Sequence, residues 1–115
     1  MQLRESGIIL FCENYEQALT FYTEKMGMHI REQKSGLAVL DFGGSYFMIE
    51  DNGIASTFPK TRAQNPIVIR FNVEDFDNTI DEIKDRGVDI EVHSFNWGKI
   101  GVIIDPEGNR IEIKD

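Results

Sequence analysis

The sequence is short of cysteine, of positive charge and of long apolar runs, and each shortage excludes a class of protein. Cys12 is the only cysteine, so an intrachain disulfide is impossible, and its place in an apolar run predicts a small buried hydrophobe. The net charge of −8 argues against a nucleic-acid partner. No apolar run approaches the ~20 residues of a membrane span, and the N-terminus shows no signal pattern. We therefore expect no membrane partner and a cytoplasmic location.

The sequence does contain an internal repeat. Residues 8–27 and 67–87 each read as an apolar run, an acidic or amide turn, an amphipathic helix and a glycine. A second pair follows, DFGGSYFMI at 41–49 and DPEGNRIEI at 105–113. The period of roughly 60 residues is too long for a solenoid and suits a duplicated half-domain. Two such halves create a cleft with pseudo-two-fold symmetry, in which equivalent positions can be compared.

Periodicity predicts the same order of elements in both halves. In the first half, Asn14 is a plausible cap and Gly27 a plausible end for the helix, and Gly43–Gly44 predicts a hairpin. In the second, Asp75 can cap the helix and Gly87 can end it. The expected strands are 8–12, 28–33, 37–42 and 46–50, then 67–73, 88–93, 100–104 and 110–114. The sequence thus predicts one α+β domain of two βαβββ modules, about 1–52 and 67–115, joined by a connector at about 53–66.

Several motifs resemble one known family. They are Cys12-Glu13-Asn14, Phe21-Tyr22 with Met26-Gly27, Val73-Glu74-Asp75 with Arg86-Gly87, and the run from Asp105 to Glu112. The chain resembles the vicinal oxygen chelate superfamily, which includes glyoxalase I, extradiol dioxygenases, fosfomycin-resistance thiol transferases and bleomycin-resistance proteins. The resemblance implies a cupped mixed sheet with helices on its outer face, usually in a homodimer.

The resemblance also implies where a metal ion would be held. Metal-dependent members take one ligand, typically His, Gln or Glu, from each of four strands. The matching positions here are Gly7, Met48, Val68 and Glu112. Glycine and valine offer no donor atom, and a thioether suits an oxygen-rich site poorly. Glu50 could replace Met48 but would add no histidine, so we expect neither a metal nor another cofactor.

Strand alternation predicts what the cup presents instead. Its lining would combine apolar side chains with a few polar ones, as small-molecule pockets do. Either Trp97 or Phe58 could add an aromatic wall. An alternative is that Arg70 simply pairs with Glu112 or Glu50 and forms a structural cluster. The predicted ligand-binding residues are Phe11, Tyr46, Met48, Glu50, Phe58, Val68, Arg70, Asn72, Trp97 and Glu112.

Three functions are compatible with this pattern. We favour a metal-free protein, similar to bleomycin-resistance proteins, that sequesters a cationic or aromatic small molecule such as an antibiotic. The second is a lyase, isomerase or glutathione-transferase type enzyme, lactoylglutathione lyase-like, in which Glu112 is the acid–base group. It is less favoured because deprotonation beside a carbonyl would lack its Lewis acid. The third is a dimeric interaction or regulatory module.

Overall fold

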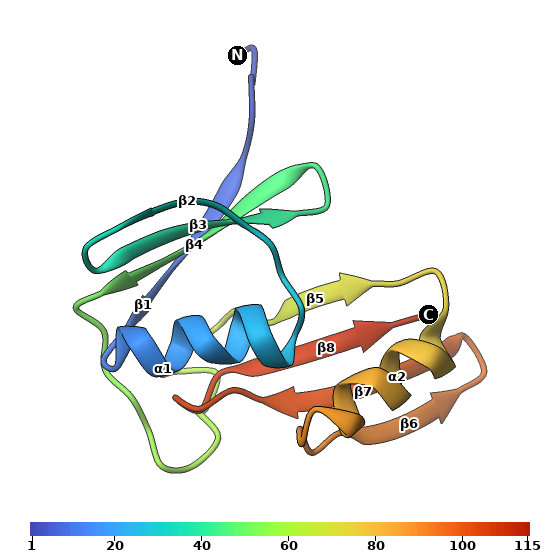
Figure 1. The fold of residues 1–115 in the computed structure, drawn as a ribbon. Coiled ribbons are helices and arrows are strands. Elements are labelled where there is room, and N and C mark those ends of the chain that lie inside the picture. Colours follow the sequence, from blue (N-terminus) through green and yellow to red (C-terminus); the bar gives the residue numbers. More distant parts are fainter. The chain divides into compact units, whose positions relative to one another are not determined.

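The computed structural model describes all 115 residues, which form two compact units, 1–55 and 56–115. Each unit contains a four-stranded mixed sheet and one short α-helix (Figure 1). The predicted α+β class and the βαβββ order of each half are confirmed. None of the helices has both the length and the apolar character needed to cross a bilayer.

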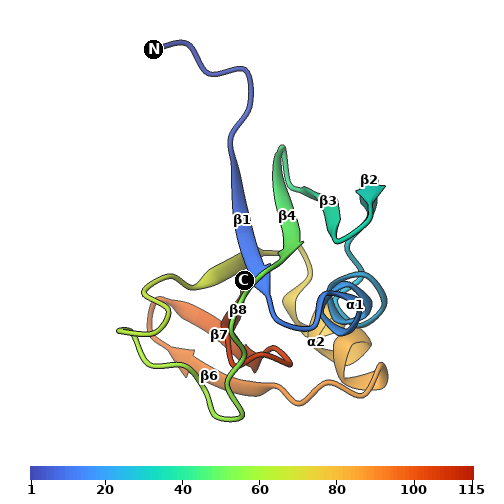
Figure 2. The same cartoon turned by 90° about the vertical axis from the view of Figure 1, so that its left-hand side faces the viewer.

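The first unit follows the predicted order closely. Its elements are β1 (Gly7–Cys12), α1 (Tyr15–Thr20), a π-helical turn (Phe21–Lys25), β2 (Ile30–Lys34), β3 (Leu37–Phe42) and β4 (Ser45–Asp51). The strand order is β1-β4-β3-β2, with β1 parallel to β4 and the other pairs antiparallel. Residues 1–6 lead away from β1 as a tail (Figure 2). The β3–β4 hairpin turns at Gly43 and Gly44, which both have the positive φ that a tight hairpin requires.

The first helix begins as predicted but widens before it ends. The side chain of Asn14 caps α1 by accepting a hydrogen bond of 3.1 Å from the Gln17 N–H. The final turn is π-helical, which a helical sequence pattern does not predict. In a regular helix, adjacent residues point about 100° apart, yet Phe21 and Tyr22 are both buried here. The Tyr22 ring meets that of Phe47 edge-on at 5.0 Å, so this turn contributes to the core on one face of the sheet.

The second unit repeats the arrangement with shorter strands. Its elements are β5 (Ile69–Asn72), α2 (Phe76–Asp85), β6 (Glu91–Phe95), β7 (Gly98–Ile104) and β8 (Arg110–Lys114), in the sheet order β5-β8-β7-β6. The strand predicted at 67–73 is shorter in the structure, because pairing with β8 begins only at Ile69, and Ile67 is 46% exposed. Asp75 caps α2 as predicted, accepting from the Asn78 N–H at 3.1 Å.

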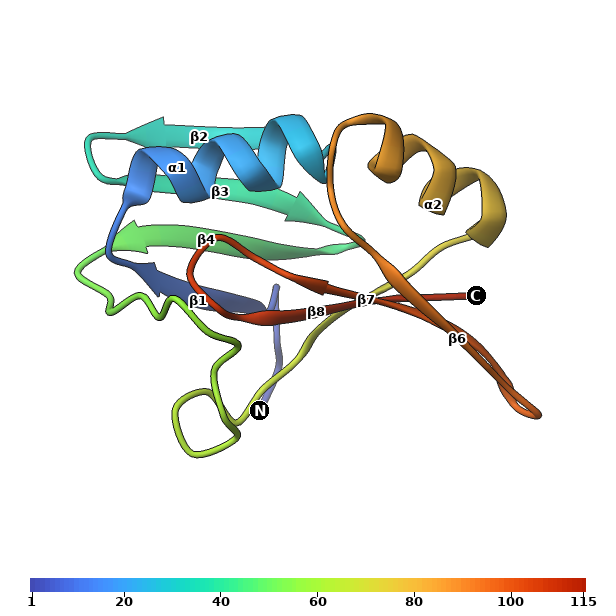
Figure 3. The same ribbon diagram turned by 90° about the horizontal axis from the view of Figure 1, so that it is seen from below.

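The segment after residue 55 is hydrogen-bonded to the turn that precedes β8. The Ser56 N–H donates to the Glu107 carbonyl at 3.0 Å, and the Lys60 N–H donates to the Gly108 carbonyl at 2.8 Å. Asn109, which is buried, accepts from the side chains of Lys60 and Asn65 through its Oδ1 atom. These contacts hold residues 56–66 as the rounded loop seen in Figure 3.

Candidate functional site

A charged cluster lies on the face of the second sheet that α2 does not cover. Residues of β8 alternate between the faces: Ile111 and Ile113 are buried on the face that α2 covers, and Glu112 points the other way. The pairing of β5 with β8 sets Arg70 directly beside Glu112, and Arg110 is on the same face two residues earlier. Glu112 is only 7% exposed, so its charge must be neutralised locally.

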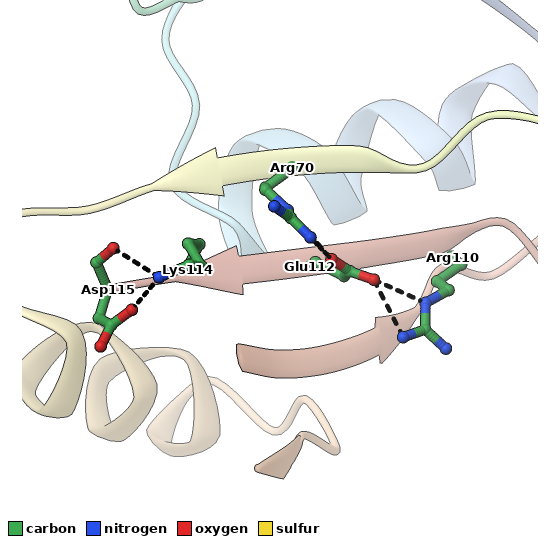
Figure 4. A network of polar contacts seen from close by, with 5 residues as sticks. All are labelled: Arg70, Arg110, Glu112, Lys114 and Asp115. Carbon is green, nitrogen blue, oxygen red and sulfur yellow. Dashed lines mark hydrogen bonds and ion pairs between the residues drawn. The ribbon is translucent and has the colours of Figure 1, made fainter. Parts of the chain in front are cut away.

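Each oxygen of the Glu112 carboxylate accepts from a different guanidinium group (Figure 4). Arg70 donates from Nε and Nη2 to Oε1 of Glu112, at 3.0 and 2.6 Å. Arg110 donates from Nε to Oε2 at 3.0 Å, and its Nη2 forms an ion pair with the same oxygen at 2.9 Å. Of the two partners considered for Arg70 in the sequence, Glu112 and Glu50, the structure shows Glu112. The role of Arg110 was missed, although its spacing of two residues from Glu112 was the available signal.

The neighbours of Glu112 decide its protonation. Burial by itself raises the pKa of this carboxyl, but the hydrogen bonds and charges of Arg70 and Arg110 outweigh burial, and the pKa lies below its ordinary value. Glu112 is thus an anion at neutral pH and a weak proton acceptor. Two positive charges surround one negative charge, so the cluster carries one net positive charge. Glu112 consequently does not supply the counter-charge for a cationic ligand that the sequence suggested.

This pairing makes stability depend on pH. Because the pKa of Glu112 is lower in the folded state, its contribution is complete above the unfolded value near 4.3 and is lost as pH falls through the folded value. We expect Glu112→Gln to lose about 1 kcal/mol at pH 7, an amount limited by the partly exposed guanidiniums, and to reduce the loss of stability between pH 7 and 3. Urea unfolding at both pH values measures this, with Glu74→Gln as the exposed control. An unchanged pH dependence in Glu112→Gln would contradict it.

A second candidate site lies entirely within the first unit. Phe11, Glu50, Asp51 and Asn52 line an open pocket of about 440 Å³ at the ends of β1 and β4. Phe11 pairs with Glu50 across these parallel strands and is 47% exposed. The pocket therefore offers an aromatic surface beside the carboxylate of Glu50, whereas Asp51, the next residue of β4, turns its carboxylate toward Gly36 on the other face of the sheet. Glu50 and Phe11 were predicted as binding residues. Asp51, the last residue of β4, and Asn52, which follows it, were missed because the predicted strand ended at residue 50.

The backbone of that turn is closely constrained. Asn52 has φ of +89°, the one positive value among the non-glycine residues. The next residue, Gly53, donates its N–H to the Cys12 carbonyl at 3.0 Å. A Cβ at Gly53 would lie 2.3 Å from the Phe11 carbonyl oxygen, so only glycine fits against β1 here. The pocket wall is thus fixed to the strand that supplies Phe11.

The other predicted residues are distributed over several places. Tyr46 and Met48 share the face of the first sheet that presents Glu50. In the second unit, Asn72 is the exposed last residue of β5, and Val68 is exposed just before that strand begins.

Trp97 and Phe58, either of which could form an aromatic wall by the sequence, lie in different places in the second unit. Trp97 stacks on Phe95, with ring centroids 4.7 Å apart, and receives the Lys114 ammonium over its ring at 5.4 Å. Phe58 is 77% exposed, and its carbonyl lies beside Gly108. Trp97 and Phe58 therefore lie at opposite ends of β8, which spans roughly 13 Å between its first and last residues.

The four positions matched to metal ligands do not fit a metal ion. The ring of Tyr46 covers Gly7 so closely that a Cβ there would lie 2.3 Å from it, and Glu112 is held by two guanidiniums. Met48 and Val68 add no hard donor. In neither unit do three or more His, Cys, Asp or Glu side chains gather in a way that could hold a metal ion. The residues present therefore do not form the four-ligand site.

Comparison with known proteins agrees with the resemblance seen in the sequence. Residues 6–113 match the model of the Glyoxalase/Bleomycin resistance protein/Dioxygenase superfamily. None of the curated protein sequences matches the chain. A solved glyoxalase/bleomycin resistance protein/dioxygenase from Alicyclobacillus acidocaldarius is 20% identical, with a TM-score of 0.77 over 96% of this chain and 89% of that one. A lactoylglutathione lyase from Agrobacterium tumefaciens is 19% identical, with a TM-score of 0.72 over 94% and 90%. At these identities the likeness shows the fold alone.

Proposed function

Because the chain belongs to the glyoxalase/bleomycin resistance protein/dioxygenase superfamily, we propose that it is a metal-independent small-molecule-binding protein of that superfamily. The state of Glu112 carries this proposal. It is the one hard donor among the four matched positions, and both of its oxygens accept from guanidiniums. A metal ion would have to displace two arginines and would then find no other hard ligand at those positions.

The pocket of the first unit supports a cationic or aromatic ligand group. The exposed ring of Phe11 can stack on a planar group or attract a cation over its face. Glu50, which pairs with Phe11 across β1 and β4, adds a negative charge to the same pocket wall. Binding here needs no covalent bond to be made or broken, so the protein would act by sequestering its ligand. An antibiotic such as bleomycin is an example of a ligand with this chemistry. Self-association as a homodimer belongs to the same proposal.

The lyase or isomerase alternative has weaker support. It draws on the likeness to a lactoylglutathione lyase and on the position of Glu112. A general base must take up a proton near neutral pH, whereas the two arginines hold the pKa of Glu112 below its ordinary value. Arg70, which the alternative would use as an oxyanion partner, already donates twice to Glu112.

Titration of the untagged protein tests the proposal. We expect Ni²⁺, Zn²⁺, Mn²⁺ and Fe²⁺ to leave the melting temperature unchanged, and bleomycin or another planar cation to bind saturably in calorimetry. Glu50→Gln and Phe11→Ala should each weaken that binding about tenfold or more, since each removes a charge-assisted or aromatic contact. Glu24→Gln, an exposed acid outside the pocket, serves as the matched control.

Two results would overturn the proposal. Stoichiometric metal binding that disappears in Glu112→Gln would restore the metal-dependent enzyme class. Ligand binding weakened equally by Glu24→Gln and Glu50→Gln would show general attraction to an acidic protein, and not a pocket.

A further inference from the structure

The cluster on the second sheet has the opposite charge character to the rest of the chain. Arg70 and Arg110 surround Glu112 with a surplus of one positive charge, in a protein whose net charge is −8. Their side chains remain 47% and 45% exposed, so the guanidiniums are accessible although the carboxylate is not.

Each guanidinium also keeps unused hydrogen-bond donors. Arginine has five N–H donors, and the contacts to Glu112 engage only Nε and Nη2 of Arg70 and of Arg110. The Nη1 atom of each, with two N–H groups, makes no hydrogen bond in the structure. Guanidinium groups prefer planar, paired contacts to carboxylate and phosphate oxygens, and these donors have the required chemistry.

We propose that Arg70 and Arg110 form a binding site for an oxyanion, the carboxylate or phosphate group of a small ligand, with Glu112 as the residue that positions both guanidiniums. This inference rests on the proposed small-molecule-binding function and adds to it a recognition element of opposite charge. Its chemistry differs from that of the Phe11 pocket, so each can fail without the other.

The arrangement favours a binding role over simple neutralisation. One arginine would be enough to balance Glu112, and the second leaves an unbalanced cation. Both are anchored through Nε and Nη2, which fixes the planes of the two guanidiniums and reduces the ordering cost of binding. Lys114, two residues further along β8, lies over Trp97 and does not join the cluster.

Nuclear magnetic resonance of the arginine Nε–H groups tests the site in the intact chain. Inorganic phosphate and, separately, acetate are titrated into labelled protein at low ionic strength. We expect saturable shifts of the Arg70 and Arg110 signals and little change at Arg62, an exposed arginine in the connector. Arg70→Lys and Arg110→Lys keep the charge but remove the fork, and each should weaken binding about tenfold.

Glu112→Gln distinguishes a site from a salt bridge. Removing the anion releases both guanidiniums from the planes that Glu112 fixes, so phosphate should bind more weakly, by about threefold or more, even though the local positive charge rises. Lys99→Gln, which removes a cation that pairs with Asp77, should leave the affinity unchanged. Preference for phosphate or for acetate identifies the ligand group, and either supports the proposal.

Three outcomes would overturn the anion site. They are shifts that never saturate, shifts of equal size at Arg62, and no loss of affinity in Glu112→Gln while that variant remains folded by its melting curve. None of these depends on the planar cation that tests the first pocket, so a failure of one proposal is not read as a failure of the other.

Discussion

Gly53→Ala is expected to lose about 2–4 kcal/mol of stability, because the added methyl would stand 2.3 Å from the Phe11 carbonyl oxygen and 2.5 Å from the Cys12 nitrogen. Both atoms belong to the backbone of β1, which cannot move without disturbing its pairing with β4. The same displacement would move Phe11 away from Glu50, so ligand binding at the first pocket should fall with stability. Urea unfolding measures the first effect and calorimetric titration the second.

Gly43→Ala is the matched control for this variant. Gly43 has a positive φ of 54°, but a Cβ there meets nothing within 4 Å. Its cost should be limited to backbone strain, about 1 kcal/mol, with ligand affinity unchanged. If Gly43→Ala and Gly53→Ala lose equal amounts of unfolding free energy, the close contact of Gly53 with β1 is not the cause of the loss.

Asp105→Ala is expected to lose about 3 kcal/mol or more. The side chain of Asp105 accepts from the N–H groups of Glu107 and Asn109 at 2.9 and 2.8 Å, and from Nδ2 of Asn109 at 2.9 Å. All three residues are buried, so removing the carboxylate leaves donors without a partner inside the protein. Because Asn109 in turn accepts from Lys60 and Asn65, residues 56–66 should loosen as well.

Denaturant unfolding measures the loss, and hydrogen exchange at the Ser56 and Lys60 amides reports the loop. Asp89→Ala, at an exposed acidic residue, controls for the change in net charge. If Asp105→Ala is destabilised but the exchange rates of both amides are unchanged, the loop at residues 56–66 does not depend on the turn at residues 105–109. That result would contradict the proposed coupling.

Local signals in the sequence predicted much of the fold. Asn14 and Asp75 act as caps because their side chains reach the free N–H groups of the first turn, a short-range interaction that residue type and position reveal. Gly43 and Gly44 predicted a hairpin because few other residues adopt its positive φ values. The π-helical turn at Phe21–Lys25 was not predictable, since it depends on burying adjacent rings against a distant strand.

The candidate sites were predicted in part. Alternation along the strands placed Arg70 on the face of Glu112 and Phe11 on the face of Glu50, because side-chain direction follows from the period of two. It could not show that Arg110 also turns to Glu112, which is a choice of rotamer. Nor could it show that Asn52 and Gly53 fold back on β1, because that contact joins residues about 40 positions apart in the chain.

The sequence alone determined which chemistry the matched positions lack. Glycine at 7 and valine at 68 have no donor atoms in any conformation, so the four-ligand site is incomplete whatever the fold. Only the tertiary structure decided what Glu112 does, because the charge and pKa of a carboxylate depend on its neighbours in space. Glu112 is buried and paired with two arginines, one from β5 and one from β8. It therefore holds a cationic cluster together and is not available as a metal ligand or a base.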